Sequence, residues 1–389
     1  MCEAGFGSGK GDRIYFFYVL ILIIDPKDEK IIAFRTRRDG FRGLLRRQRL
    51  DDTAPPGASD KYQGGFYVYN EGSYGRTPAS VNYYDKTTGE WSLNLYQENN
   101  EGEKLGNTGT VAVCSDDNVY FVSKETPWLV EVGLEDFLKK SALPDGALTG
   151  QAYGFALIDG KHGVLTTSEG AYSVSLDPLE LGDAFFEGRG LGGDVAVKDG
   201  RVFLTASAGE GDVVKVYDAS TLAFVKDLPA AAKTGFAEAG GMLWAAAGNK
   251  LFKINTTALT SEEVTLGDDL SVYYNQWAYT PTGLHASKKG DALYFVEGSS
   301  SGYDVYRFTI ATGAAEKLFP APEVDGTRYS VYGAGLNADP ESDDLYLFYT
   351  ADWGGHATIY VVDGTTGEQK KSFPYTDAEY WFPSMILFR

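Results

Sequence analysis

The chain is poor in the residues that most metal and redox sites use. Its 389 residues include only three histidines, two cysteines and three methionines. Cys2 and Cys114 offer no zinc-ligand spacing, and Cys114 lies in an apolar strand where a free thiol packs as a small hydrophobic group. His162, His285 and His356 fall in different parts of the repeat described below, which argues against a three-histidine centre. The sequence therefore predicts no metal site and no resident cofactor.

Positive charge is also scarce. Lys and Arg number 35 against 54 Asp and Glu, for a net charge of −19. The first 50 residues oppose this trend with 11 basic and 6 acidic residues, so the remainder carries 24 basic and 48 acidic residues. A body this acidic will not bind nucleic acid, whose phosphates need clustered Lys and Arg. It suits a protein that must not adhere to anionic surfaces.

The apolar run at residues 14–24 is too short to span a bilayer, at 11 residues, but is about right for the core of a secretory signal. Asp25 and Pro26 follow it directly, without a small-residue cleavage site or a lipid-accepting cysteine. Three interpretations of residues 1–50 stay open: an export signal, a segment from a misassigned start or shifted frame, and a buried strand. Residues 51–60, rich in Asp and Pro, predict a flexible tether before a folded domain at 61–389.

A unit of several short strands recurs seven times between Gly65 and Leu387. Each copy has a small-residue strand, a turn rich in Asp, Gly or Lys, a more hydrophobic second strand, a loop, and a third strand closed by an Asp-x-x-Thr-Gly-like turn. A repeat of about 47 residues with this content is typical of a β-propeller. The sequence predicts an all-β, seven-bladed propeller whose second strands are residues 65–70, 118–123, 163–168, 201–206, 242–247, 292–297 and 344–349.

The two ends of the repeat complement each other. The first copy starts at Gly65 on its second strand, with no inner strand before it. Pro383–Phe388 resembles an inner strand with no blade after it. The C-terminal strand is therefore predicted to complete the first blade and close the ring, which leaves no free sheet edge.

One face of the predicted ring carries an unusual number of aromatic residues. Loops that leave the second strands and loops that enter the inner strands emerge on the same face, which we call the loop face. Aromatic rings mixed with amides suit a large, partly apolar small molecule or a sugar. For any single ring, the alternative is a wedge packed between blades. The predicted ligand-binding residues are Trp128, Trp277, Trp353, Trp381, Tyr74, Tyr153, Tyr303, Asn70, Lys124, Asn275, Gln276 and His356.

Signals for catalysis are weak. Residues 298–302 (GSSSG) match the nucleophile-elbow spacing but lack the strand–turn–helix context that gives the pattern its meaning. His285 or His356 with a nearby tyrosine leaves a lyase-like propeller enzyme as an alternative. On the face opposite the loops, the Asp residues of the short turns are expected to be Asx-turn formers.

Several stretches resemble a known family. GGFYVYNEGSYG (64–75), GMLWAAAGNKLFKIN (241–255) and EYWFPSMILF (379–388) are similar to bacterial propellers of the YVTN-repeat and YncE-like type, above all to the surface-exposed lipoprotein branch of Gram-negative gut anaerobes. Some members of that branch, the BtuG type, cap an outer-membrane TonB-dependent transporter and capture cobalamin. The branch carries an acylated cysteine before an Asp-rich tether, and no cysteine stands at that place here.

The resemblance implies a monomeric, non-catalytic, ligand-binding propeller at the outer face of the outer membrane or in the periplasm, with a corrinoid as ligand and a TonB-dependent transporter as partner. Three alternatives stay open: a carbohydrate-binding surface protein, a propeller enzyme such as a lyase, and a protein-interaction scaffold.

Overall fold

The computed structural model describes residues 21–24, 31–34, 62–188, 191–208, 211–275, 277–278, 283–299, 301–351, 355–375 and 382–388. The chain divides into two compact units, residues 1–55 and residues 56–389. In the first unit, β1 (Ile21–Ile24) and β2 (Ile31–Phe34) pair as an antiparallel hairpin. The predicted tether at 51–60 lies outside the described residues. No helix in the described part of the chain is long and apolar enough to cross a membrane.

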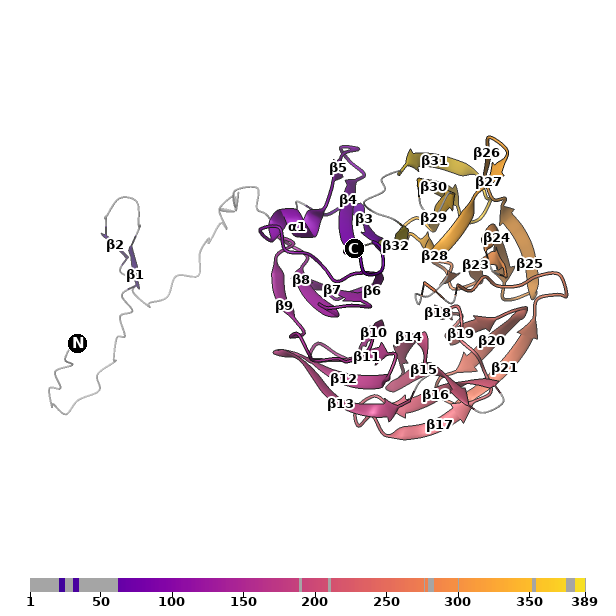
Figure 1. The fold of residues 1–389 in the computed structure, drawn as a ribbon, viewed down its shortest axis with the longest axis horizontal. Coiled ribbons are helices and arrows are strands. Elements are labelled where there is room, and N and C mark those ends of the chain that lie inside the picture. Colours follow the sequence, from indigo (N-terminus) through magenta and orange to yellow (C-terminus); the bar gives the residue numbers. More distant parts are fainter. Residues whose placement is uncertain are drawn as a thin grey trace, which may run out of the picture. The chain divides into compact units, whose positions relative to one another are not determined.

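The second unit is a propeller-like arrangement of antiparallel sheets around a common axis (Figure 1). In the described part of this unit, five sheets have four strands each. The first sheet combines the two chain ends in the order β32 (Pro383–Leu387), β3 (Gly65–Asn70), β4 (Ser80–Asp85) and β5 (Trp91–Ser92). Helix α1 (Leu95–Asn99) follows it. The second sheet comprises β6 (Gly109–Cys114), β7 (Asn118–Ser123), β8 (Leu129–Gly133) and β9 (Lys139–Ala142).

The next three sheets follow the chain in order. The third sheet comprises β10 (Ala152–Leu157), β11 (His162–Thr167), β12 (Gly170–Leu176) and β13 (Leu179–Glu187). The fourth comprises β14 (Leu191–Lys198), β15 (Arg201–Ala208), β16 (Gly211–Asp218) and β17 (Phe224–Leu228). The fifth comprises β18 (Phe236–Ala239), β19 (Met242–Ala247), β20 (Lys250–Asn255) and β21 (Thr260–Thr265).

The predicted sixth and seventh units share one eight-stranded sheet. A single pair, Gly302 with Val331, joins their strands. The small hairpin of β26 (Glu323–Val324) and β27 (Thr327–Arg328) lies between them in the chain. The eight strands are β22 (Leu284–Ala286), β23 (Ala292–Gly298), β24 (Gly302–Thr309), β25 (Ala314–Phe319), β28 (Ser330–Ala338), β29 (Asp344–Ala351), β30 (His356–Asp363) and β31 (Gln369–Pro374).

The predicted pairing of the two chain ends is present. β32 pairs antiparallel with β3, with Tyr67 opposite Leu387 and Val68 opposite Ile386. Because the pairing places Ile386 and Phe66 in one core cluster with side chains of β29–β31, it also joins the first sheet to the eight-stranded sheet. On the opposite face, Lys86 of the first sheet forms an ion pair of 2.8 Å with Asp339, which follows β28.

Sequence and structure agree on the turns opposite the loops. The side chain of Asp85 accepts hydrogen bonds from the backbone amides of Thr87 and Thr88, at 2.7 and 3.1 Å. Asp218, Asn255 and Asp363 cap the equivalent turns in the same way. The hydrogen bonds from Thr87 and Thr88 lower the pKa of Asp85. In the turn that follows Asp218, the hydrogen bond from the Ser220 hydroxyl makes the largest contribution, and the pKa of Asp218 falls to about 2. The Asx-turn prediction is confirmed at these positions.

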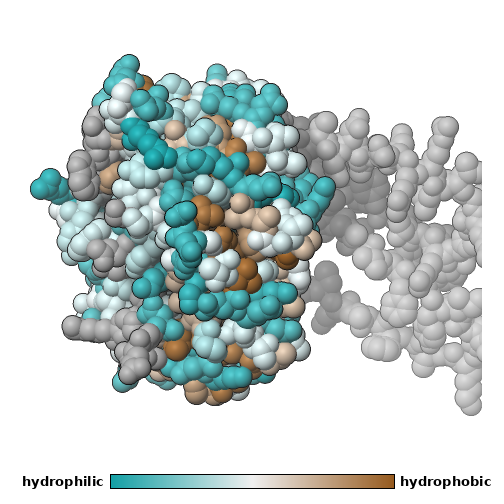
Figure 2. Space-filling view, turned by 90° about the vertical axis from the view of Figure 1, so that its right-hand side faces the viewer, coloured by the Kyte–Doolittle hydropathy of each residue, from teal (hydrophilic) through white to brown (hydrophobic). Residues whose placement is uncertain are grey.

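The outer surface is mostly hydrophilic on the side shown in Figure 2, where apolar residues form small patches between polar ones. The apolar side chains gather instead between neighbouring sheets. Trp244, for example, is 2% exposed and packs against Phe308 across the boundary between the fifth and the eight-stranded sheets.

Removing residues 382–389 should unfold or oligomerise the protein, because β3 would lose its neighbour and the apolar side chains beneath β32 would meet water. Thermal melting followed by circular dichroism, with size-exclusion chromatography, measures both outcomes. A chain lacking residues 1–55 is the control and should melt like the full chain. Full-length stability in the C-terminal truncation would refute the role given to β32.

Candidate functional site

Four segments from three sheets meet near the axis on the loop face. Glu71 follows β3, Lys124 follows β7, and Tyr332 lies near the start of β28. Tyr273 and Asn275 belong to the segment before β22. We call these five residues the axial cluster. They come from the ends of β3 and β7 and from the beginnings of inner strands, where the alternating strand direction places them at one end of the propeller-like body.

Glu71 is held rigidly although it lies in a loop. Its backbone amide donates to the carbonyl of Phe382 (2.8 Å), and its own carbonyl accepts from Gly109 (2.8 Å). The Tyr332 hydroxyl donates to Oε1 of Glu71 at 3.2 Å. The Tyr332 ring in turn stacks on Phe382, with 4.0 Å between the ring centroids and 17° between the planes. The Glu71 backbone is therefore fixed by Phe382 and Gly109, and one oxygen of its carboxyl group is fixed by Tyr332.

Lys124 connects the second sheet to the segment before β22. Its side-chain ammonium donates to the carbonyl of Trp277 at 2.7 Å, across 153 residues of sequence. The backbone amide of Trp277 donates to Oδ1 of Asn275 (2.9 Å), and the amide of Asn275 donates to the Tyr273 hydroxyl (3.0 Å). This chain of hydrogen bonds places the Trp277 segment beside the axial cluster.

The cluster contains two opposite charges that are both poorly hydrated. Glu71 and Lys124 are each 5% exposed. Burial raises the pKa of Glu71, and the nearby Lys124 ammonium opposes that rise. Burial likewise lowers the pKa of Lys124, and Glu71 opposes that fall. Groups that are this desolvated interact strongly with each other and with polar neighbours, so the pair holds the surrounding loops in a fixed arrangement.

Two predicted site residues are exposed, in loops that are hydrogen-bonded to Lys124 and Glu125. Trp277 is 68% exposed and Tyr74 is 60% exposed. The Tyr74 hydroxyl accepts a hydrogen bond from Gln151 (3.3 Å), and the amide of Gly75 donates to the carboxylate of Glu125 (3.3 Å). Lys124 and Glu125 thus link the two loops that carry the aromatic rings. The structure brings together Tyr74, Lys124, Asn275 and Trp277 from the predicted set.

Three predicted residues lie in the interior instead. Asn70 has no exposed surface, and its amide bonds the side chains of Ser80 (3.1 Å) and Tyr375 (2.9 Å), so it supports the junction between the first and the eight-stranded sheets. Trp128 is 8% exposed and belongs to a core cluster of the second and third sheets, which is the wedge alternative. Tyr153 is also 8% exposed. Their side chains offer little surface to a ligand.

The remaining predicted residues divide into two groups. Tyr303 is half-buried at the start of β24, and the Arg328 guanidinium lies 4.3 Å from its ring centroid. His356 is exposed at the start of β30. Gln276, Trp353 and Trp381 lie outside the described residues. Glu71 was missed at the sequence level, because a single glutamate after a strand forms no catalytic or metal-binding pattern.

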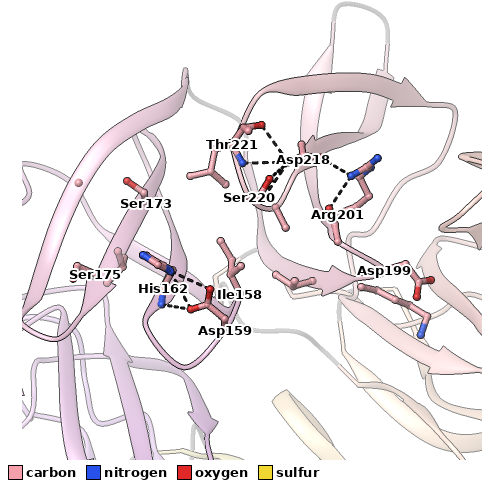
Figure 3. A pocket seen from close by; sticks show the side chains of 18 of the residues that line it. Ile158, Asp159, His162, Ser173, Ser175, Asp199, Arg201, Asp218, Ser220 and Thr221 are labelled. Carbon is pink, nitrogen blue, oxygen red and sulfur yellow. Dashed lines mark hydrogen bonds and ion pairs between the residues drawn. The ribbon is translucent and has the colours of Figure 1, made fainter.

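A hollow lies on the face opposite the loops, between the third and fourth sheets (Figure 3). This cavity of about 1090 Å³ has polar side chains that pair with each other. Asp218 binds Arg201 at 2.6 Å, and His162 Nδ1 lies 3.0 Å from Asp159. Because these groups are already paired, we take the hollow to be a structural groove between sheets.

The inner strands line a cavity of about 560 Å³ along the axis, which we call the axial cavity. Its lining includes His285 and Asp194. Burial lowers the pKa of His285 to about 4 and raises that of Asp194 to about 6. Among the described residues, no group of three or more His, Cys, Asp or Glu side chains is placed to hold a metal ion.

Comparison with known proteins places the chain in a family. A family described as a domain of unknown function, DUF5074, matches residues 64–389. The chain belongs to the DUF5074 family. That match covers all the sheets of the second unit, so the loop face and the axial cluster both lie within it. No curated protein matches the sequence.

Solved structures resemble the fold of this DUF5074 protein. A quinoprotein alcohol dehydrogenase-like protein from Bacteroides thetaiotaomicron matches with a TM-score of 0.67 and 19% identity, over 84% of this chain and 78% of that one. Apo AztD from Citrobacter koseri matches at 0.50 and 12%, over 81% and 83%. The dihydro-heme d1 dehydrogenase NirN matches at 0.50 and 10%, over 80% and 74%. These likenesses support the propeller-like fold alone.

The neutral state of His285 should make stability depend on pH. In the unfolded chain its pKa is that of an ordinary histidine, about 6.5. The folded pKa is lower, so the unfolded chain takes up this proton first, and stability is lost as the pH falls from about 6.5 towards about 4. Asp194, whose folded pKa is raised, opposes this loss below about pH 6. Urea unfolding of the wild type and of His285→Gln should be measured between about pH 6.5 and 4. The unfolding free energy should fall less steeply with pH in the variant, and an equal fall in both proteins would contradict the lowered pKa of His285.

Proposed function

We propose that this DUF5074 protein is a seven-bladed, non-catalytic propeller that captures a ligand on its loop face outside the cytoplasm. The convergence of Tyr74, Lys124, Asn275 and Trp277 around the axial cluster carries the proposal. Trp277 and Tyr74 expose two aromatic rings on loops that Lys124 and Glu125 link. A ligand that covers both rings would remove their apolar surface from water.

The ligand we propose is a corrinoid such as cobalamin, passed on to a TonB-dependent transporter of the outer membrane. A corrin is broad and flat, and amide side chains surround its edge. The Trp277 and Tyr74 rings would cover its apolar area, and Asn275 would hydrogen-bond its amides. Lys124, which is 5% exposed, would hold the Trp277 segment in place. The family resemblance of the 64–75 and 379–388 segments supports this choice. Glu71 of the axial cluster comes from the first segment, and Phe382, whose carbonyl accepts from the Glu71 amide, comes from the second.

Substitution of Trp277 by alanine should weaken cyanocobalamin binding about tenfold or more, since covering a large aromatic side chain contributes roughly 1.5–3 kcal/mol. The melting temperature should change little, because the ring is 68% exposed in the free protein. Titration calorimetry with cyanocobalamin and parallel thermal melts measure the two effects.

Trp244→Ala is the matched control. Trp244 is 2% exposed and its indole N–H donates to the carbonyl of Ala239 at 3.1 Å. Its removal should cost about 3–5 kcal/mol of stability, as for other buried aromatic residues, and leave the affinity of the folded fraction unchanged. Absence of cyanocobalamin binding by the wild type would exclude the corrinoid, and binding of an oligosaccharide in its place would favour a glycan ligand.

A further inference from the structure

The axial cavity has the size and lining of a small-molecule site. Its volume of about 560 Å³ falls within the range of about 300–1,000 Å³ that ligand pockets occupy. Its lining residues come from β6, β10, β14, β18, β22 and β32. Of these, the labelled strands β6, β10, β14, β18 and β32 surround the axis in Figure 1. Most of its lining is apolar, including Val111, Phe155, Phe236, Leu284 and Met385.

One acid in this cavity has no cation beside it. The carboxylate of Asp194 accepts a hydrogen bond from the backbone amide of Phe236 at 2.8 Å and another from the amide of Val195. Among the described residues, no Lys or Arg forms an ion pair with it. The Asp194 side chain is half-buried. A carboxylate that has lost part of its hydration is usually paired with a cation, so Asp194 departs from the usual arrangement.

The other titratable groups of the cavity do not compensate this charge. Glu238 also lines the cavity, and its carboxylate is paired at 2.6 Å with the ammonium of Lys198. Because burial lowers its pKa to about 4, His285 is uncharged at neutral pH. An imidazole in that state presents one nitrogen acceptor and one N–H donor. Cys114 also lines the cavity. The cavity therefore offers one uncompensated carboxylate, one neutral histidine and apolar walls.

We propose that the axial cavity is a second binding site, distinct from the loop face, that takes a small amine. Its ammonium group pairs with Asp194, and its apolar body packs against the walls formed by Leu157, Phe236 and Met385, which are half-buried. An anion would be repelled by Asp194, and a neutral apolar molecule would leave the carboxylate without a partner. An amphipathic cation satisfies both the charge and the apolar lining.

Titration of the full chain with tryptamine and with tryptophol tests this site. The two probes share the indole ring and differ in carrying an ammonium or a hydroxyl group. Tryptamine should bind at least about tenfold more tightly than tryptophol, as expected for a charge-assisted hydrogen bond. Near pH 6, tryptamine binding should also release protons, seen as a heat that depends on the buffer, because a cation beside Asp194 favours its ionised form.

Two substitutions of a carboxylate by an amide distinguish binding at Asp194 from a nonspecific effect of removing negative charge from the cavity. Asp194→Asn should weaken tryptamine binding at least about tenfold and abolish the proton release. Glu238→Gln, in the same cavity, should bind within about twofold of the wild type because Glu238 already has Lys198 as partner. Asp194→Asn should melt at or above the wild-type temperature at pH 8, since it removes a desolvated charge.

The proposal is overturned if tryptamine does not bind the wild type up to its solubility limit, if tryptophol binds equally well, or if Asp194→Asn keeps its affinity. Trp277→Ala should leave tryptamine binding unchanged, so this site can fail while the loop-face function stands, and the reverse also holds.

Discussion

The pairing of β32 with β3 is the constraint on which the rest of the molecule depends. Pairing of the two chain ends stabilises a set of sheets around an axis, because it leaves no free edge on β3. Here the join is made by one strand of five residues, Pro383–Leu387, which adds main-chain hydrogen bonds to β3 and buries Ile386. Tyr375 adds side-chain support from beyond β31, where its hydroxyl bonds Asn70.

The same join positions the candidate site. Glu71 follows β3 directly, and its amide bonds the carbonyl of Phe382, the residue before β32. Gly72 comes next with a φ of 73°, a region that glycine enters at little cost, and a side chain there would collide with the carbonyl of Thr77. The Asn-Glu-Gly sequence at 70–72 thus supplies a structural amide, a buried carboxyl group and a turn. Closure of the fold and construction of the axial cluster depend on the same three residues.

Much of this fold could be predicted because the residues of each strand and of the turns beside it form a local pattern that repeats along the chain. The second strands β3, β7 and β19 begin and end at the predicted residues, and the missing inner strand of the first unit indicated where the C-terminus pairs. The fusion of the last two units into one sheet could not be predicted, since it depends on a single bridge between Gly302 and Val331. Trp128 and Trp277 both occur in loops, yet one is buried and one exposed. That difference depends on what the neighbouring sheet places against each ring, which a single loop sequence does not contain.

Native-state hydrogen exchange of the β3 amides tests the central role of chain closure most directly. If the β32–β3 pairing holds the fold together, the amides of β3 that pair with β32 should exchange only through global unfolding. Their opening free energy should then equal the unfolding free energy from denaturant titration and fall in parallel with it as denaturant is added. Exchange of these amides through a local opening of much lower free energy, with the other sheets still protected, would contradict the account.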